Sequence, residues 1–129
     1  MSRGNYSPHQ SSIANMDANI MAVLTYILPI IAANLPIIWG IAWILPVAIF
    51  FMEKNSNLVK FHAMQSVALH VVRVVVLSIL GIIPLLGGLV GFIVGIAFTL
   101  LAIIAIVGAF SYEEFHIPFI GDFVARLIK

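Results

Sequence analysis

The sequence has no cysteine and little charge. Its 129 residues include six Lys or Arg and five Asp or Glu, so charged residues make up 9% of the chain, against roughly 25% in soluble domains. Without cysteine there can be no disulfide, no thiolate nucleophile and no Cys-ligated metal. The net charge of +1 provides no basic surface for nucleic acid. These absences exclude thiol chemistry and nucleic-acid binding.

The few charges are spaced so that long segments have none. Residues 18–52 and 74–112 contain no Asp, Glu, Lys or Arg, and Arg73 alone separates the second segment from the charge-free residues 61–72. Apolar residues make up 63% of the chain, which is more than one small soluble core can bury. The pattern predicts an all-α integral membrane protein. A strand barrel is excluded because its strands would alternate polar and apolar residues.

A membrane-spanning helix needs about 20 residues, and this length predicts four transmembrane helices in two hairpins. Pro36 can occupy the first helical position of the second helix, Ser56 or Asn57 can cap the third, and Pro84 marks the turn before the fourth. The polar tail 1–11 precedes a four-helix membrane domain over 12–112, and a C-terminal interfacial segment covers 113–129. The predicted helices span residues 12–33, 36–52, 57–82 and 88–110.

The C-terminal segment predicts an amphipathic helix. Its apolar residues recur at helical spacing, with Asp122, Arg126 and Lys129 opposite. Such a helix lies in the membrane interface, or it docks on the cytoplasmic face of the bundle itself. An ordered N-terminal tail would indicate that a partner holds it, because so polar a segment has no core of its own.

Basic residues predict the orientation. Five of them flank the predicted helices, and all lie on the side of the termini and the central loop; the two opposite turns carry no charge. The positive-inside rule then places both termini and residues 53–60 in the cytoplasm, as expected for a multi-pass protein of a prokaryotic plasma membrane. The five residues are Arg3, Lys54, Lys60, Arg126 and Lys129.

The third helix carries a polar stripe. His62, Ser66, His70 and Arg73 share one helical face, and Gln65 borders it. His62 is expected near the interface and needs no special role. Arg73 lies about 18 Å from the start of the span, at 1.5 Å per residue. A charge there costs at least about 2.5–3.5 kcal/mol, so Arg73 is expected to face a polar group.

Several groups could accept hydrogen bonds from Arg73. Pro29 and Pro46 free two helical carbonyls, and two hydroxyls lie at similar depth. A structural polar knot, a transport path and an acceptor on another subunit or a lipid all remain open. The candidates within the chain are the carbonyls of Thr25 and Ala42 and the hydroxyls of Tyr26 and Thr99.

The remaining features favour packing over chemistry. Gly87, Gly91 and Gly95 recur at a spacing that lets two helices approach closely. His70 is the one histidine predicted inside a span, so it could ligate a chlorophyll-type pigment; otherwise we expect no cofactor beyond such a pigment or a lipid on His70 or Arg73. No metal-spaced cluster or catalytic constellation occurs, so the chain is not expected to be an enzyme. The pair at 113–114 is interpreted as solvated carboxylates.

Two short motifs carry a family resemblance. The segment Phe61-His62-Ala63-Met64-Gln65-Ser66 precedes a span, and Pro118-Phe119-Ile120-Gly121-Asp122 follows the last one. Together they resemble small bacterial and archaeal membrane proteins of unknown function. That family is distantly similar to the twenty-kilodalton channel-like subunit of the chloroplast inner-envelope import translocon. The resemblance implies four helices with cytoplasmic termini, and motif roles for Phe61, His62, Gln65, Pro118, Gly121 and Asp122.

Two hypotheses for the function follow. The first is an accessory or structural subunit of a larger respiratory, photosynthetic or secretory membrane complex, contacting the bilayer and binding other subunits through the fourth helix and the N-terminal tail. The second is a small channel, transporter or protein-translocation component that uses the polar stripe. A flat apolar outer face would favour the first, and a water-filled cavity around Arg73 the second.

Overall fold

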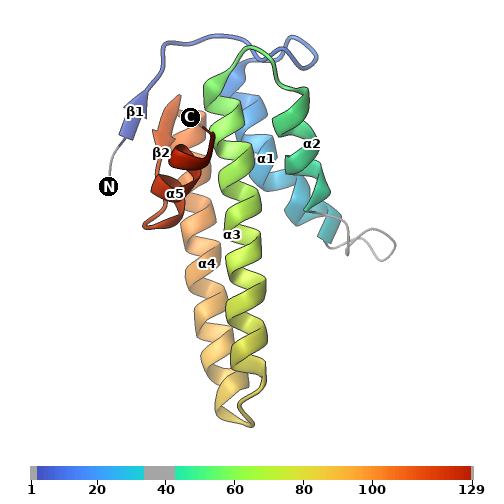
Figure 1. Ribbon diagram of the computed structural model, residues 1–129, viewed down its shortest axis with the longest axis vertical. Coiled ribbons are helices and arrows are strands. Elements are labelled where there is room, and N and C mark those ends of the chain that lie inside the picture. Colours follow the sequence, from blue (N-terminus) through green and yellow to red (C-terminus); the bar gives the residue numbers. More distant parts are fainter. Residues whose placement is uncertain (1–2, 34–42, 129) are drawn as a thin grey trace.

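The computed structural model describes residues 3–33 and 43–128, which form a helical bundle with two short strands at one end (Figure 1). The described residues confirm the helical fold class, with the strands as a minor addition. In chain order the elements are β1 (Arg3–Asn5), α1 (Ala18–Ala33), α2 (Ile44–Met52), α3 (Asn57–Gly81), α4 (Leu86–Phe110), β2 (Glu113–Phe115) and α5 (Ile120–Ile128).

The hairpin of α3 and α4 forms the long axis of the molecule (Figure 1). Each helix has 25 residues and is therefore about 37 Å long. By length and composition both could cross a membrane, whereas α1 is apolar but shorter. The described parts of α1 and α2 lie beside the half of α3 nearer its N-terminus, and the α3–α4 turn extends past them (Figure 1).

The helix α1 begins at Ala18, six residues later than predicted. Ala14 and Asn15 have φ values of 56° and 53°, in the left-handed region that ends or excludes a helix for L-residues. Gln10 and Asp17 pair as an isolated β-bridge. The chain before Ala18 therefore folds back as a loop, and its polar groups bind other segments instead of starting a helix.

The other predicted boundaries are closer to the structure. The helix α2 ends at Met52 as predicted, but its predicted start and the turn over 33–36 fall largely on residues 34–42, outside the described residues. Ser56 caps α3 as predicted, since its side chain accepts a hydrogen bond from the Val59 amide over 3.2 Å. The helix α4 starts at Leu86, two residues earlier than predicted, and ends at Phe110.

The N-terminal tail packs on its own chain. The strand β1 pairs antiparallel with β2, with Gly4 opposite Glu114, and the Tyr6 amide donates to the Tyr112 carbonyl over 2.9 Å. Contacts within the chain therefore order the tail, and its order does not indicate a partner. The strand pair and α5 lie at the same end of the bundle as the loop between α2 and α3 (Figure 1).

Burial is uneven along the bundle. Most of the buried core residues come from α1, the first turns of α3, the end of α4 and the segment after it. At the far end the large apolar side chains are exposed; Leu85 in the α3–α4 turn is 95% exposed. The end that carries the termini is thus a packed and polar structure, and the other end is an apolar hairpin with exposed sides.

Candidate functional site

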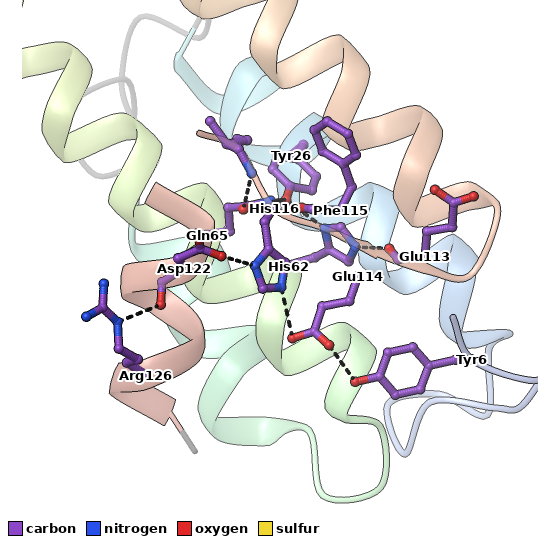
Figure 2. Close-up of polar contacts among 11 residues, drawn as sticks. Tyr6, Tyr26, His62, Gln65, Glu113, Glu114, Phe115, His116, Asp122 and Arg126 are labelled. Carbon is purple, nitrogen blue, oxygen red and sulfur yellow. Dashed lines mark hydrogen bonds and ion pairs between the residues drawn. The ribbon is translucent and has the colours of Figure 1, made fainter. Parts of the chain in front are cut away.

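The first turns of α3 face the segment that follows α4, and together they enclose a polar cluster that we call the junction (Figure 2). Phe61 of α3 stacks on His116, with ring centroids 4.7 Å apart and 23° between the ring planes. The two sequence motifs, far apart in the chain, are therefore in direct contact. The junction consists of Tyr26, Phe61, His62, Gln65, Glu114, Phe115, His116, Ile117, Gly121 and Asp122.

Gln65 connects three segments at the junction. It is fully buried, and its amide nitrogen donates to the Tyr26 hydroxyl over 2.8 Å and to the Phe115 carbonyl over 3.0 Å. Its oxygen accepts from the Ile117 amide over 3.0 Å. A buried backbone group that is left unpaired costs roughly 1–3 kcal/mol. The Gln65 side chain pairs the Phe115 carbonyl and the Ile117 amide, which lie outside any helix.

His62 is the second residue of α3 that binds Tyr26. Its Nε2 lies 2.8 Å from the Glu113 carbonyl oxygen, and its Nδ1 lies 2.7 Å from the Tyr26 hydroxyl. A carbonyl can only accept, so Nε2 carries the proton and Nδ1 accepts from Tyr26. Tyr26 then donates to His62 and accepts from Gln65. The Tyr26 hydroxyl is thus used both as a donor and as an acceptor. His62 is fully buried and joins α1 to the C-terminal segment, so the expectation that it needs no special role is wrong.

Gly121 allows α5 to approach this cluster. A Cβ atom at this position would lie 2.4 Å from the His116 Cα and 2.7 Å from the Gln65 Oε1. The next residue, Asp122, accepts from the His116 Nδ1 over 2.6 Å. The motif therefore has a physical basis: glycine removes a clash, and aspartate fixes the His116 ring that stacks on Phe61.

Glu114 is buried, with 4% of its surface exposed. The prediction that this carboxylate is solvated is therefore wrong. It lies 3.6 Å from the His116 Nε2 and accepts a hydrogen bond from the Tyr6 hydroxyl over 3.1 Å. Burial, together with the nearby Glu114 charge, raises the pKa of Tyr6 to about 12. The neutral tyrosine is thus the donor that joins the tail to the junction (Figure 2).

A second polar cluster, the tail clamp, forms around Glu53 in the loop before α3. The Glu53 carboxylate accepts from the Ser11 hydroxyl and from the amides of Ser12, Asn55 and Ser56. Burial alone would raise the pKa of Glu53, but these hydrogen bonds outweigh it and lower the pKa to about 2. Glu53 therefore stays ionised and holds the tail against the loop.

His9 strengthens the clamp. Its Nδ1 lies 2.7 Å from the Ser7 carbonyl and must donate to it, so its Nε2 accepts from the Ser56 hydroxyl, 2.7 Å away. The same Ser56 oxygen caps α3 by accepting from Val59. One serine thus links the N-terminus of α3 to the tail.

The polar stripe divides into two parts. His62 and Gln65 belong to the junction, whereas Ser66, His70 and Arg73 line a cavity of about 120 Å³ between α1, α3 and α4. The other walls are mainly apolar and include Pro29 and Phe98. Sequence spacing correctly placed these residues on one face, but two different environments lie along it.

None of the predicted acceptors within the described residues binds Arg73. Tyr26 is bound to His62 and Gln65, and the Thr99 hydroxyl donates to the Gly95 carbonyl over 3.0 Å. Among the described residues, no hydrogen bond joins Arg73 to the Thr25 carbonyl. The predicted acceptor at position 42 lies outside the described residues. Among the described residues, Arg73 forms no hydrogen bond or ion pair.

The glycines of α4 differ in their surroundings. A Cβ on Gly87 would lie 2.0 Å from the Leu80 carbonyl oxygen, so this glycine is needed for the α3–α4 turn. A Cβ on Gly91 would meet only Leu77 at 3.9 Å, and one on Gly95 would meet nothing within 4 Å. Among residues 3–33 and 43–128, another segment therefore comes close to Gly87 but not to Gly91 or Gly95.

Sequence reasoning missed several junction and clamp residues. Tyr26, in α1, is predicted above only as an acceptor for Arg73. Ser11, Glu53 and His116 lie outside the helices and belong to no short motif, so no local pattern marks them. The described residues contain no group of three or more metal-ligating side chains. The arrangement is a structural one: Glu53 in the loop before α3 binds the N-terminal tail, and His62 and Gln65 in the first turns of α3 bind the C-terminal segment. The possible pigment on His70 stays a prediction.

Comparison with known proteins agrees with a membrane protein family. A family model described as the magnetosome magnetite crystal formation protein family matches residues 17–124. A UPF0132 membrane protein of Archaeoglobus fulgidus is 34% identical over 113 residues, which cover 88% of this chain and 97% of the relative. A UPF0132 membrane protein of Methanocaldococcus jannaschii is 26% identical over 114 residues, covering 88% of this chain and 72% of the relative.

A second such protein of Methanocaldococcus jannaschii is 33% identical over 107 residues, covering 83% of this chain and 84% of the relative. No solved structure matches. The predicted resemblance to archaeal membrane proteins of unknown function is confirmed, while these matches give no support to a similarity with the chloroplast translocon. The chain belongs to the MamF/MmsF family, the magnetosome magnetite crystal formation protein family, and is related to the UPF0132 membrane proteins.

Proposed function

We propose that the protein is a non-catalytic accessory subunit that binds another membrane helix through the exposed α3–α4 face. In this proposal the chain passes the membrane four times and both termini are cytoplasmic. In an organism that forms magnetosomes, such a subunit would take part in magnetite crystal formation, the process named in the family description.

The observation that carries the proposal is an open groove on this face. Its volume is about 390 Å³, and Gly91, Gly95, Thr99 and Arg73 are among its lining residues. Small residues stabilise helix pairs only where a second backbone comes close, and the space above Gly95 is empty. A helix from a second protein would fill it.

Arg73 supports the same proposal. It lines the groove and forms no hydrogen bond or ion pair within the part of the chain that the structure describes. The described parts of α1, α2, α3 and α4 contain no carboxylate. A charge in such surroundings is stabilised when a neighbouring subunit supplies an acceptor. The partner helix is therefore expected to carry a carboxylate, an amide or a free carbonyl at this depth.

Substitution of adjacent residues tests the docking face. Gly95→Leu places a side chain in the groove, whereas Ile96→Leu changes an already large, 47% exposed residue at the next position. Purification in mild detergent followed by mass spectrometry of the co-purifying subunits should show a partner lost in Gly95→Leu and retained in Ile96→Leu. Equal recovery with both variants, at equal protein stability, would show that the groove does not dock a helix.

The topology has its own test, made simple by the lack of cysteine. The α2–α3 loop, the start of α3 and α5 lie at the same end of the bundle (Figure 1). These segments carry Lys54, Lys60 and Arg126, whereas the α3–α4 turn is uncharged. A cysteine at Gly88 should react with an impermeant thiol reagent added outside cells, and one at Asn55 should react only after lysis. The reverse pattern would invert the proposed orientation.

A transport role is the second candidate, because Ser66, His70 and Arg73 line the inner cavity and Arg73 also borders the outer groove. A polar path through the bundle would use these residues. Ion flux into liposomes that contain the purified protein tests this function: a flux reduced in both Arg73→Gln and His70→Gln supports it. Flux no greater than that of empty liposomes leaves the subunit role as the better proposal.

A further inference from the structure

An apolar groove of about 590 Å³ runs between α3 and α5, and every side chain that lines it is apolar. Met64, Val67 and Val71 contribute from one face of α3. Phe123 and Leu127 contribute from α5, and Phe119, the residue just before α5, also lines the groove. The volume lies within the range of ligand pockets, about 300–1,000 Å³. It is separate from the α3–α4 groove used above, and it involves neither Arg73 nor the glycines of α4.

Three of the large apolar side chains that line the groove are exposed, and a hydrocarbon chain in the groove would cover them. Phe119 is 91% exposed, Phe123 58% and Leu127 61%, whereas Val124 beside them is fully buried against the bundle. Phe119 also has a φ of 67°, a conformation that costs a non-glycine residue about 1–2 kcal/mol. The turn before α5 therefore leaves an aromatic side chain exposed beside the groove.

Cationic side chains lie at one end of the groove. Lys60 is one helical turn before Met64 and on the same face of α3. Ile128, which follows the groove-lining Leu127, lines a neighbouring cavity of about 310 Å³ together with Lys60 and Glu114. Arg126 is exposed on the adjacent side of α5. Within the described residues neither cation forms an ion pair. The Arg126 Nε donates to the Asp122 carbonyl over 3.4 Å, so both charges are available for a further anion.

We propose that the groove binds one anionic phospholipid, with an acyl chain between α3 and α5 and its phosphate between Lys60 and Arg126. The charge favours an anionic over a zwitterionic lipid, because each basic residue near a membrane surface contributes about 1 kcal/mol toward anionic lipids. The acyl chain covers the aromatic side chains that the fold leaves exposed. The bound lipid would hold α5 in place and so stabilise the junction.

Native mass spectrometry and thermal unfolding of the delipidated protein in detergent test the proposal. The probes are dioleoyl phosphatidylglycerol, which is anionic, and dioleoyl phosphatidylcholine, which is zwitterionic. We expect one bound phosphatidylglycerol per chain and a higher melting temperature with it than with phosphatidylcholine. Lys60→Gln and Arg126→Gln should each weaken phosphatidylglycerol binding about fivefold, which corresponds to about 1 kcal/mol.

Two further variants locate the acyl chain. Ala68→Phe fills the groove from α3, whereas Ala97→Phe adds the same ring at an exposed position of α4 outside it. Lipid binding lost in the first and retained in the second supports the proposal. Equal effects of the two lipids, or equal binding by the two phenylalanine variants, would overturn it. A dimer that resists lipid and dissociates in Ala68→Phe would also overturn it, by assigning the groove to a second copy.

Discussion

Replacing Gly121 by alanine should loosen α5, although the same change usually stabilises a helix. In an exposed helix, Gly→Ala is worth roughly 0.5–1 kcal/mol in favour of folding. Here the new Cβ would lie 2.4 Å and 2.5 Å from the Cα and Cβ of His116 and 2.7 Å from the Gln65 Oε1. Two of these atoms belong to or adjoin the backbone, so they cannot move aside cheaply.

The expected magnitude follows from these contacts. Overpacking of a tight site costs about 1–3 kcal/mol, and the gain in helix propensity offsets part of it. We therefore expect a net loss of about 1–2 kcal/mol. If the strain exceeds the docking energy of α5, the helix will separate and the Asp122–His116 hydrogen bond will break.

A single cysteine measures this opening. Val124 lies on the inner face of α5 and is fully buried. A Val124→Cys variant of this cysteine-free chain therefore reacts with a thiol reagent only when α5 separates from the bundle. Gly121→Ala should accelerate labelling, and Gly88→Ala, where a Cβ meets nothing within 4 Å, should not. Labelling at the same rate in both backgrounds would show that the close approach at Gly121 does not hold α5.

Three further changes test the junction and the tail clamp. Gln65→Leu should lower stability by a few kcal/mol in detergent unfolding, since each of its three buried partners costs roughly 1–3 kcal/mol when unpaired; a loss below about 1 kcal/mol would contradict its role. The pKa of Glu53 is lowered from 4.5 to about 2, so its stabilisation is complete above about pH 4.5 and is lost as the pH falls toward 2. Proteolysis of the tail should accelerate over that interval and, at neutral pH, in Glu53→Gln, whereas a pH-independent rate would refute the clamp. Tyr6→Phe removes the hydrogen bond to Glu114 and should increase hydrogen exchange in β1 while leaving α3 unchanged; equal exchange in wild type and variant would show that the tail is held without it.

The sequence predicted the helical segments well where a strong signal marks an end. Ser56 caps α3 because its hydroxyl can accept from the backbone, and this signal is local. Apolar runs likewise located α3 and α4. The start of α1 was misplaced because the polar groups of residues 11–17 bind Glu53 and the tail, which no local pattern records.

The candidate site was predictable only in part. Spacing placed His62, Gln65 and Arg73 on one side of a helix, but spacing cannot say what each residue meets. The resemblance selected Gly121 and Asp122 without a reason, and the structure gives one: both face His116. The buried state of Glu114 could not be read from a charged pair after a helix end, since it depends on pairing with β1.

The position of the hydrogen-bonded clusters explains how so apolar a chain keeps a defined shape. In a bilayer, apolar packing gives little preference between helix arrangements, because lipid is as apolar as the side chains. The junction and the tail clamp lie at one end of the bundle, where His62, Gln65 and Glu53 bind backbone groups of the tail and the C-terminal segment. These bonds fix that end, while the far part of α3 and α4 keeps an open face. A hydrogen-bonded polar end combined with an exposed helical hairpin fits the subunit role proposed above, in which the open face of the hairpin binds a second helix.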